Sequence, residues 1–314
     1  MSKKSVNFFG MRSSLAARAA DRWLRRIFKP RLAAAATLGE AREILDLRLP
    51  YAPPVGGFRS AALGGVTGEW TLAGREDAPA LLYLHGGAYF AGSARQYRPI
   101  TAFFARQGFD VFAPDYRLAP AHPFPAGVED ARSAWDALLS ERAEPVALAG
   151  DSAGGGLCLA LALALRDAGA PLPAAMALFS PWTDLAVTGE SARDNEERDA
   201  MFTRRMLKIA ARAYLGPAHA RAPLASPLYA ELRGLSPLLI HASRTEMLRD
   251  DSTRLAARAG AAGVAVELEL WDGVPHGWQL AAAHMPEARE SLEKAAAFLA
   301  ARLTEGVSRA RDLE

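Results

Sequence analysis

Hydrophobic positions follow two alternating patterns along the chain from residue 80 onward. Short runs of consecutive apolar residues are typical of strands covered by helices on both faces, and they occupy residues 80–84, 109–113, 146–149, 174–179, 238–242 and 264–271. Longer stretches rich in Ala, Leu and Arg predict helices near residues 95–107, 125–140, 153–168, 248–262 and 286–303. This alternation predicts an α/β fold with a mostly parallel sheet, extended at an antiparallel edge by strands near 43–49 and 69–72.

Residues 11–28 have a hydrophobic side and a basic side when arranged as a helix. The apolar side chains are Leu15, Ala19, Trp23, Leu24, Ile27 and Phe28, and the arginines are Arg12, Arg18, Arg22, Arg25 and Arg26. Such a helix either docks on its own protein as a lid, which we favour, or lies in the interface of a membrane.

Residues 186–224 interrupt the alternation of strands and helices between two core strands. They contain a short helix that Thr203 is expected to cap and Gly216-Pro217 to end, with Met206, Ala210 and Tyr214 on one face. We therefore predict one α/β core of residues 46–185 and 225–303, covered by a helical cap of residues 1–45 and 186–224.

The composition excludes several classes of protein. Half of the 314 residues are hydrophobic and 23% are charged, which suits a large buried core rather than a disordered chain. Lys and Arg number 37 against 35 Asp and Glu, without a basic block, so no nucleic-acid partner is expected. No apolar run reaches the roughly 18 residues of a membrane span. No secretory signal pattern is present, and the single cysteine, Cys158, suits a reducing compartment, so we expect a cytoplasmic protein.

A serine follows one predicted strand in a turn built from small residues. The sequence Gly150-Asp151-Ser152-Ala153-Gly154 comes directly after the strand at 146–149 and opens a predicted helix. Small residues two positions before and after the serine allow a strained turn in which strand and helix pack closely. This turn lifts the hydroxyl to the helix N-terminus, and Ser152 is therefore the predicted nucleophile.

A second glycine turn, His85-Gly86-Gly87-Ala88, follows the strand at 80–84. Acyl transfer develops negative charge on a carbonyl oxygen, which fixed backbone N–H groups stabilise by about 3 kcal/mol each. We expect Gly86 and Gly87 to supply two such groups and Ala153 a third. Ala88 is able to replace one of the glycine pair.

The partners of a nucleophilic serine in this kind of sheet come later in the chain, the acid before the histidine. Of the six histidines, His276 lies in a Gly/Pro loop directly after the strand at 264–271, so it is the predicted base. The strand at 238–242 is followed by Glu246, Asp250 and Asp251. We predict Glu246 as the acid, with the two aspartates as competitors.

These motifs together resemble the hormone-sensitive lipase-like esterases, a branch of the α/β-hydrolases, over about residues 44–300. Residues 85–88 resemble H-G-G-G, residues 115–130 resemble Y-R-L-A-P…F-P-A…D, residues 150–155 match G-D-S-A-G-G, and residues 180–185 match S-P-W-x-D-L. The resemblance implies an eight-stranded sheet, an N-terminal helical cap, and hydrolysis of carboxylesters without a cofactor or a metal ion. The chain departs from the family in Ala88, which replaces a glycine, and in Glu246, where an aspartate is commoner.

The predicted activity is hydrolysis of small esters with short or medium acyl chains through an acyl-enzyme on Ser152. A lactonase or an amidase would use the same residues, and a ligand-binding protein without catalysis is the remaining alternative. Trp182 and Tyr214 are candidates either for substrate contact or for core packing. Residues 264–271 also predict an exposed edge strand, and such an edge favours a homodimer.

Overall fold

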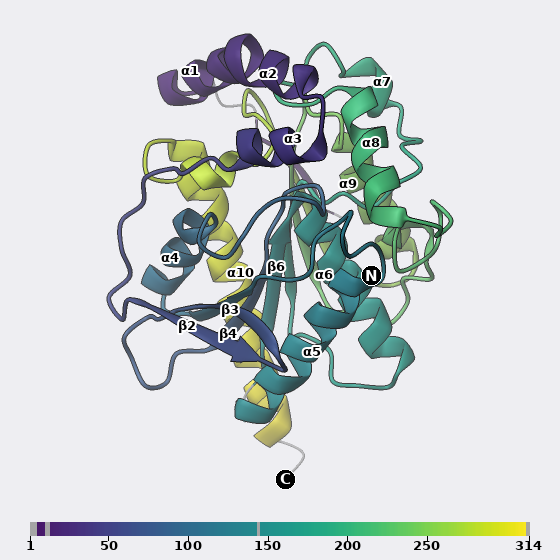
Figure 1. Ribbon diagram of the computed structural model, residues 1–314. Helices are drawn as coiled ribbons and strands as arrows, with labels where there is room; N and C mark the ends of the chain where they lie inside the picture. The colour runs from purple at the N-terminus through teal and green to yellow at the C-terminus, as the bar shows by residue number, and fades with distance from the viewer. Residues whose placement is uncertain (1–4, 10–12, 143–144, 312–314) are drawn as a thin grey trace.

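The predicted alternation of strands and helices builds one sheet with helices on both of its faces (Figure 1). The structure is a computed structural model, which describes residues 5–9, 13–142 and 145–311. The α/β-hydrolase fold expected from the sequence is confirmed.

Nine strands among the described residues follow the order β1-β9-β8-β7-β6-β4-β5-β3-β2 across the sheet. Their bounds are β1 (Ser5–Phe9), β2 (Phe58–Leu63), β3 (Val66–Thr71), β4 (Ala80–Leu84), β5 (Asp110–Pro114), β6 (Ala147–Asp151), β7 (Met176–Phe179), β8 (Leu238–Ser243) and β9 (Val266–Trp271). β3 is antiparallel to both of its neighbours, β2 and β5, whereas the other neighbouring pairs are parallel. Strands β4 to β8 are buried at every position, which explains their continuously apolar sequences.

The antiparallel end of the sheet corrects one prediction. Residues 43–49 do not form a strand, because the chain up to Leu45 belongs to helix α3 (Leu38–Leu45). The hydroxyl of Thr37 caps this helix by accepting a hydrogen bond of 3.1 Å from the N–H of Glu40. The outer antiparallel strand at this edge is β2, which pairs with β3. The expected eight-stranded sheet is therefore formed by β2 to β9.

The ninth strand changes the prediction about oligomerisation. The sequence predicts residues 264–271 as an exposed edge, but β1 pairs in parallel with β9, residues 5–9 opposite residues 267–271. The edge of β9 is therefore covered by the chain itself. The prediction of a homodimer through β9 depended on an exposed edge, and β1 occupies that edge. A second chain would have to displace β1 or pair with β1 instead.

Two layers of helices enclose the sheet. Helices α4 (Arg98–Arg106) and α10 (Pro286–Arg311) cover one face, and α5 (Ala126–Glu141), α6 (Ser152–Asp167) and α9 (Arg249–Ala261) cover the other. Because successive strand residues point to opposite faces, Leu81 and Tyr83 pack in the first layer and Leu82 and Leu84 in the second. Cys158, on α6, is fully buried in the second layer.

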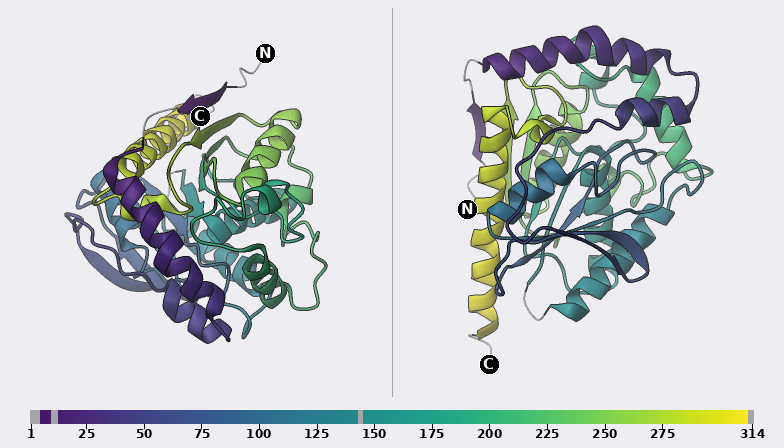
Figure 2. Two further views of the ribbon diagram at one scale, coloured as in Figure 1. Left: turned by 90° about the horizontal axis from the view of Figure 1, so that it is seen from above. Right: turned by 60° about the vertical axis from the view of Figure 1, so that its left-hand side comes forward.

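The other α-helices of the described residues and one π-helical turn lie over one end of the sheet, where β6 passes into α6 (Figure 2). They are α1 (Leu15–Trp23), the π-helical η1 (Leu24–Phe28), α2 (Lys29–Ala34) and α3 from the first segment, and α7 (Ser191–Asp194) and α8 (Arg204–Leu215) from the second. The two segments touch, because Lys29 donates hydrogen bonds to the carbonyl oxygens of Glu196 at 2.6 Å and Asp199 at 2.8 Å. None of the described helices is long and apolar enough to cross a membrane.

Candidate active site

Ser152 occupies the tight turn between β6 and α6. Its φ is +51°, a left-handed conformation that is strained for a residue with a side chain and is typical of a functional turn. A Cβ atom on Gly154 would overlap the carbonyl oxygen of Leu84 at the end of β4, so α6 needs glycine there to approach this neighbouring strand so closely. The predicted strand–turn–helix context of the serine is therefore present.

His276 and Glu246 meet in a buried hydrogen bond. Nδ1 of His276 lies 2.5 Å from Oε2 of Glu246, and the two residues are 6% and 1% exposed. The other carboxylate oxygen, Oε1, accepts hydrogen bonds from the hydroxyl of Ser180 at 2.8 Å and the N–H of Ser243 at 2.7 Å. The carboxylate is thus held by donors at the ends of β7 and β8.

The environment of His276 favours its protonated form. Burial by itself lowers the pKa of this imidazole, but the hydrogen bond and the charge of Glu246, with the charges of Asp199 and Asp151, raise the pKa above 6.5. The loop that carries the histidine is tied to β8, because the hydroxyl of Ser243 donates to the carbonyl oxygen of Val274 at 2.6 Å. The same strand end therefore positions both the acid and the histidine loop.

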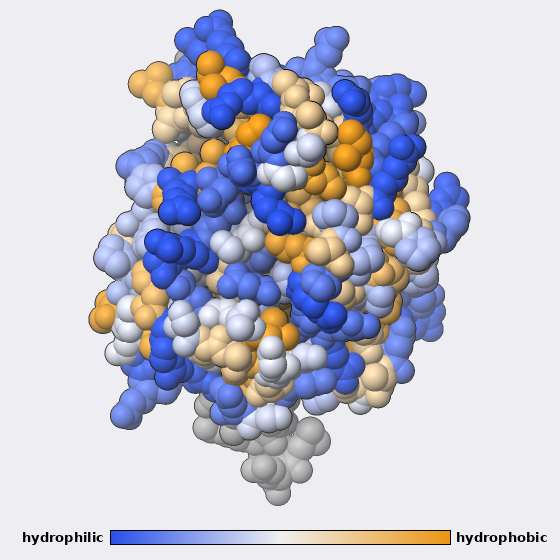
Figure 3. All heavy atoms as spheres, viewed as in Figure 1, coloured by the Kyte–Doolittle hydropathy of each residue, from blue (hydrophilic) through white to orange (hydrophobic). Residues whose placement is uncertain are grey.

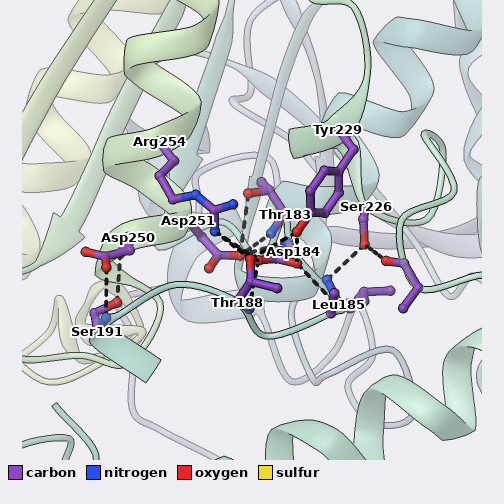
Figure 4. Close-up of polar contacts among 12 residues, drawn as sticks. Thr183, Asp184, Leu185, Thr188, Ser191, Ser226, Tyr229, Asp250, Asp251 and Arg254 are labelled. Atoms are coloured by element: carbon purple, nitrogen blue, oxygen red, sulfur yellow. Dashed lines mark hydrogen bonds and ion pairs between the residues drawn. The ribbon is translucent and has the colours of Figure 1, made fainter. Parts of the chain in front are cut away.

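The two aspartates that compete for the role of the acid have other partners (Figure 4). Oδ2 of Asp250 accepts from the N–H of Ser191 at 2.8 Å, and Oδ2 of Asp251 accepts from the N–H groups of Thr183 and Asp184 at 2.7 and 2.8 Å. Both carboxylates thus hold backbone segments in place. Of the three candidate acids, Glu246 is the one hydrogen-bonded to His276.

The glycine turn after β4 corrects one predicted donor. The N–H of Gly86 donates to Oδ1 of Asp151 at 2.9 Å, so it is already used inside the protein. Gly87 has a φ of +116° and Ala88 a φ of +53°, and neither N–H has a hydrogen-bond partner among the described residues. Ala153 lies at the start of α6, where N–H groups have no partner within the helix.

Asp151 is a functional candidate that sequence reasoning passed over. Besides Gly86, it accepts hydrogen bonds from the hydroxyls of Tyr83 at 2.8 Å and Tyr97 at 3.1 Å. Burial raises its pKa to about 6, although these hydrogen bonds and the nearby His276 act to lower it. Asp151 therefore fixes the glycine turn against the serine turn, a role that its place beside the serine could have suggested.

Asp199 connects the cap to the acid. Its Oδ1 accepts from the N–H groups of Met201 and Phe202, each at 2.8 Å, and its Oδ2 accepts from the N–H of Met247 at 2.7 Å, one residue after Glu246. Burial raises the pKa of this carboxyl. Its three donors come from two segments far apart in the chain, so no local sequence pattern predicts this role of Asp199.

Ser152 and His276 line one pocket of about 180 Å³ between the serine turn and the cap. Most of its other walls are apolar, and α1 and η1 contribute Ala20, Trp23 and Leu24 to them. The ring of Phe202 contacts that of His276 edge to face, with 5.1 Å between the centroids. A second pocket, of about 490 Å³, lies between α2, α3 and α8 and shares Leu45, Ala88 and Phe202 with the first.

Trp182 and Tyr214, the two candidates for substrate contact, are not in the lining of either pocket. Trp182 is 1% exposed, and its indole N–H donates to the carbonyl oxygen of Asp184 at 3.2 Å. Tyr214 stacks on Tyr89 with 3.7 Å between the ring centroids. Both side chains are packed in the core, which favours the packing alternative over substrate contact.

Within the described residues, no group of three or more His, Cys, Asp and Glu side chains is arranged to hold a metal ion. The reactive groups that the structure brings together at this site are a serine hydroxyl, an imidazole, carboxylates and backbone N–H groups. These groups are arranged for transfer of an acyl group to a hydroxyl.

Fold and site together define the class of protein. The sequence profile of the alpha/beta hydrolase fold matches residues 81–280. The chain is 43% identical over 248 residues to an acetyl-hydrolase of Streptomyces hygroscopicus, a match that covers 78% of this chain and 83% of that protein. It is 35% identical over 263 residues to an esterase of Acinetobacter venetianus, covering 82% and 87% of the two chains.

Solved structures narrow the class. The crystal structure of an esterase from the bacterial hormone-sensitive lipase family superposes with a TM-score of 0.87 at 39% identity, covering 93% of this chain and all of the other. A hormone-sensitive lipase from a metagenome library superposes with a TM-score of 0.83 at 36% identity, covering 90% and 98%. The chain belongs to the α/β-hydrolases, in their hormone-sensitive lipase-like branch, and it is a carboxylic ester hydrolase.

Proposed function

We propose that the protein hydrolyses small carboxylesters through an acyl-enzyme on Ser152, with His276 as the base and Glu246 as the acid. The observation that carries this proposal is the buried 2.5 Å contact between Glu246 and Nδ1 of His276, in a pocket that Ser152 also lines. A carboxylate only accepts hydrogen bonds, so it keeps the imidazole proton on Nδ1. Nε2 then carries a lone pair that can take a proton from a hydroxyl.

The reaction proceeds in two acyl transfers. Nε2 of His276 takes the proton of the Ser152 hydroxyl while the serine oxygen bonds to the ester carbon. When the tetrahedral intermediate collapses, the alkoxide leaves and receives this proton, which frees the alcohol. Water then gives a proton to Nε2 and attacks the acyl carbon, and the proton returns to Ser152 as the acid departs.

The oxyanion of each intermediate is stabilised by the N–H groups of Gly87, Ala88 and Ala153. Gly86 is left out because its N–H is bonded to Asp151. Each such donor is worth about 3 kcal/mol in the transition state, because it is fixed before the charge develops. Gly86 instead acts one step away, by holding the turn against Asp151.

The substrate is an ester with a short or medium acyl chain. The pocket at Ser152 has a volume of about 180 Å³ and largely apolar walls, which favour an alkyl group over a charged one. The second pocket offers further apolar space beyond Phe202. The chain-length profile therefore depends on whether a substrate passes this side chain.

A fluorophosphonate probe and a panel of nitrophenyl esters test the proposal. The probe should label the wild type at Ser152, and the Ser152→Ala variant should lose both labelling and hydrolysis while keeping its circular dichroism spectrum. Labelling of another residue, or hydrolysis by the variant, would refute the assignment. A higher kcat/KM on lactones or anilides than on esters would replace the esterase by a lactonase or an amidase with the same residues.

A further inference from the structure

The helical segment of residues 15–34 buries one side and leaves a second apolar stripe in solvent. Its buried side chains are Ala17, Leu24, Phe28 and Leu32, each at most 8% exposed. Leu15 is 78% exposed, and Trp23 and Ile27 are each 46% exposed. The described part of the chain has five large hydrophobic side chains with comparable exposure, and three of them are on this segment. The lid docking favoured from the sequence therefore leaves the stripe unexplained.

Arginines flank this stripe. Arg22 and Arg26 directly precede the exposed Trp23 and Ile27, Arg18 lies one helical turn before Arg22, and Arg31 follows on α2. All four are exposed, and no acidic partner accompanies any of them among the described residues. Arg25 behaves differently, because it pairs with Asp21 at 2.8 Å. The entire chain has a net charge of only +2, so the exposed side of this segment is more basic than the protein as a whole.

The stripe also borders the catalytic pocket. Trp23 is half exposed and at the same time lines this pocket together with Ala20 and Leu24. α1 and α2 lie across the end of the molecule, and Figure 3 shows hydrophobic and hydrophilic side chains interleaved on this end. A surface in contact with the outer side of α1 would therefore lie close to the pocket that Ser152 lines.

We propose that the exposed face of α1, η1 and α2 docks on an anionic lipid bilayer, and that the protein takes ester substrates from this bilayer. The uptake of ester substrates rests on the proposed function, whereas the docking does not. A helix with a basic row and an apolar stripe containing tryptophan lies in the plane of a membrane interface, with the arginines at the lipid phosphates. Each basic residue near an anionic surface contributes about fivefold to binding. A second copy of the chain fits this face poorly, because it would bring eight arginines together.

Vesicle flotation tests the docking without any need for activity. The full chain carrying Ser152→Ala is mixed with vesicles of neutral phosphatidylcholine, or of phosphatidylcholine with about 30% phosphatidylglycerol. We expect binding to the anionic vesicles that weakens with salt, and little binding to the neutral ones. The double variant Arg18→Gln/Arg22→Gln should bind about 25-fold more weakly, from two arginines at about fivefold each. Leu15→Ser/Ile27→Ser should weaken the binding that remains at high salt.

A matched control removes two exposed arginines elsewhere. Arg59 and Arg233 are exposed, and Arg59→Gln/Arg233→Gln changes the net charge equally but should keep wild-type binding. Equal losses in the two double variants, no binding to anionic vesicles, or a change in oligomeric state in place of vesicle binding would each overturn the proposal. Hydrolysis of nitrophenyl acetate without vesicles should be unchanged in Arg18→Gln/Arg22→Gln. If flotation fails while this hydrolysis persists, the docking is wrong and the esterase assignment stands.

Discussion

Replacement of Glu246 by glutamine tests the assignment of the acid, because the two carboxylate oxygens of Glu246 have different hydrogen-bond partners. Oε1 accepts from the N–H of Ser243 at 2.7 Å and from the hydroxyl of Ser180, whereas Oε2 faces Nδ1 of His276 at 2.5 Å. A glutamine has one acceptor oxygen and one NH₂ group to place at these two positions. The NH₂ group cannot face Ser243, since the backbone N–H there is a donor with no alternative role. The amide oxygen must therefore stay at Ser243, and the NH₂ group must point at His276.

This orientation reverses the tautomer of the imidazole. Facing an NH₂ donor, Nδ1 has to accept, so the proton moves to Nε2 and no lone pair is left for the serine hydroxyl. The equivalent change in the Ser-His-Asp proteases lowers turnover by about 10⁴, which corresponds to about 5 kcal/mol of transition-state stabilisation. We expect a loss in kcat of two to four orders of magnitude for Glu246→Gln, with the fold retained.

The assay is kcat on nitrophenyl acetate, corrected for the folded fraction by circular dichroism. Asp250→Asn and Asp251→Asn are matched controls. Each aspartate accepts backbone N–H groups through Oδ2, and an asparagine oxygen can do the same. Both controls should lose less than about tenfold. If Asp250→Asn lost its activity while Glu246→Gln stayed active, the acid would be Asp250. The reasoning from the two carboxylate oxygens of Glu246 would then be refuted.

Three further predictions concern the surroundings of the site. The acidic limb of kcat/KM should have its midpoint above pH 6.5, because the pKa of His276 is raised and only the neutral imidazole accepts a proton; a rate that stays flat from pH 8 to pH 5 would contradict this. Phe202→Ala should join the two pockets and increase the kcat/KM of octanoate relative to acetate esters, by up to about fourfold per methylene group buried; an unchanged ratio would show that the second pocket takes no part. Asp199→Asn should lower the free energy of unfolding by about 2 kcal/mol, because an NH₂ group replaces an acceptor of backbone N–H groups; urea unfolding measures this, and equal stability would argue against the link between cap and acid.

The structure agrees with the sequence where the signal is local. β4 to β8 are buried on both faces, so their sequences are continuously apolar and their positions could be predicted within a few residues. The serine turn could be predicted because the small residues of its strand–turn–helix motif lie within five positions of one another in the sequence. The prediction of a strand at residues 43–49 was wrong because its apolar residues have another origin. Leu45 is the last residue of helix α3, and Leu47 lies in the segment that follows this helix.

The sequence by itself determined most of the strands and helices and the reactive residues in the turns that follow them. It could do so because hydrophobic periodicity and turn residues depend on contacts close by in the chain. Only the tertiary structure decided how those groups are shared. Gly86 is adjacent to Gly87 in a turn that looks equivalent, yet its N–H is taken by Asp151, 65 residues away. In the same way, the edge of β9 is covered by β1, and the stripe of α1 stays in solvent because the opposite side docks on the core. Each of these outcomes depends on a contact between distant segments, and such contacts leave no periodic trace in either partner.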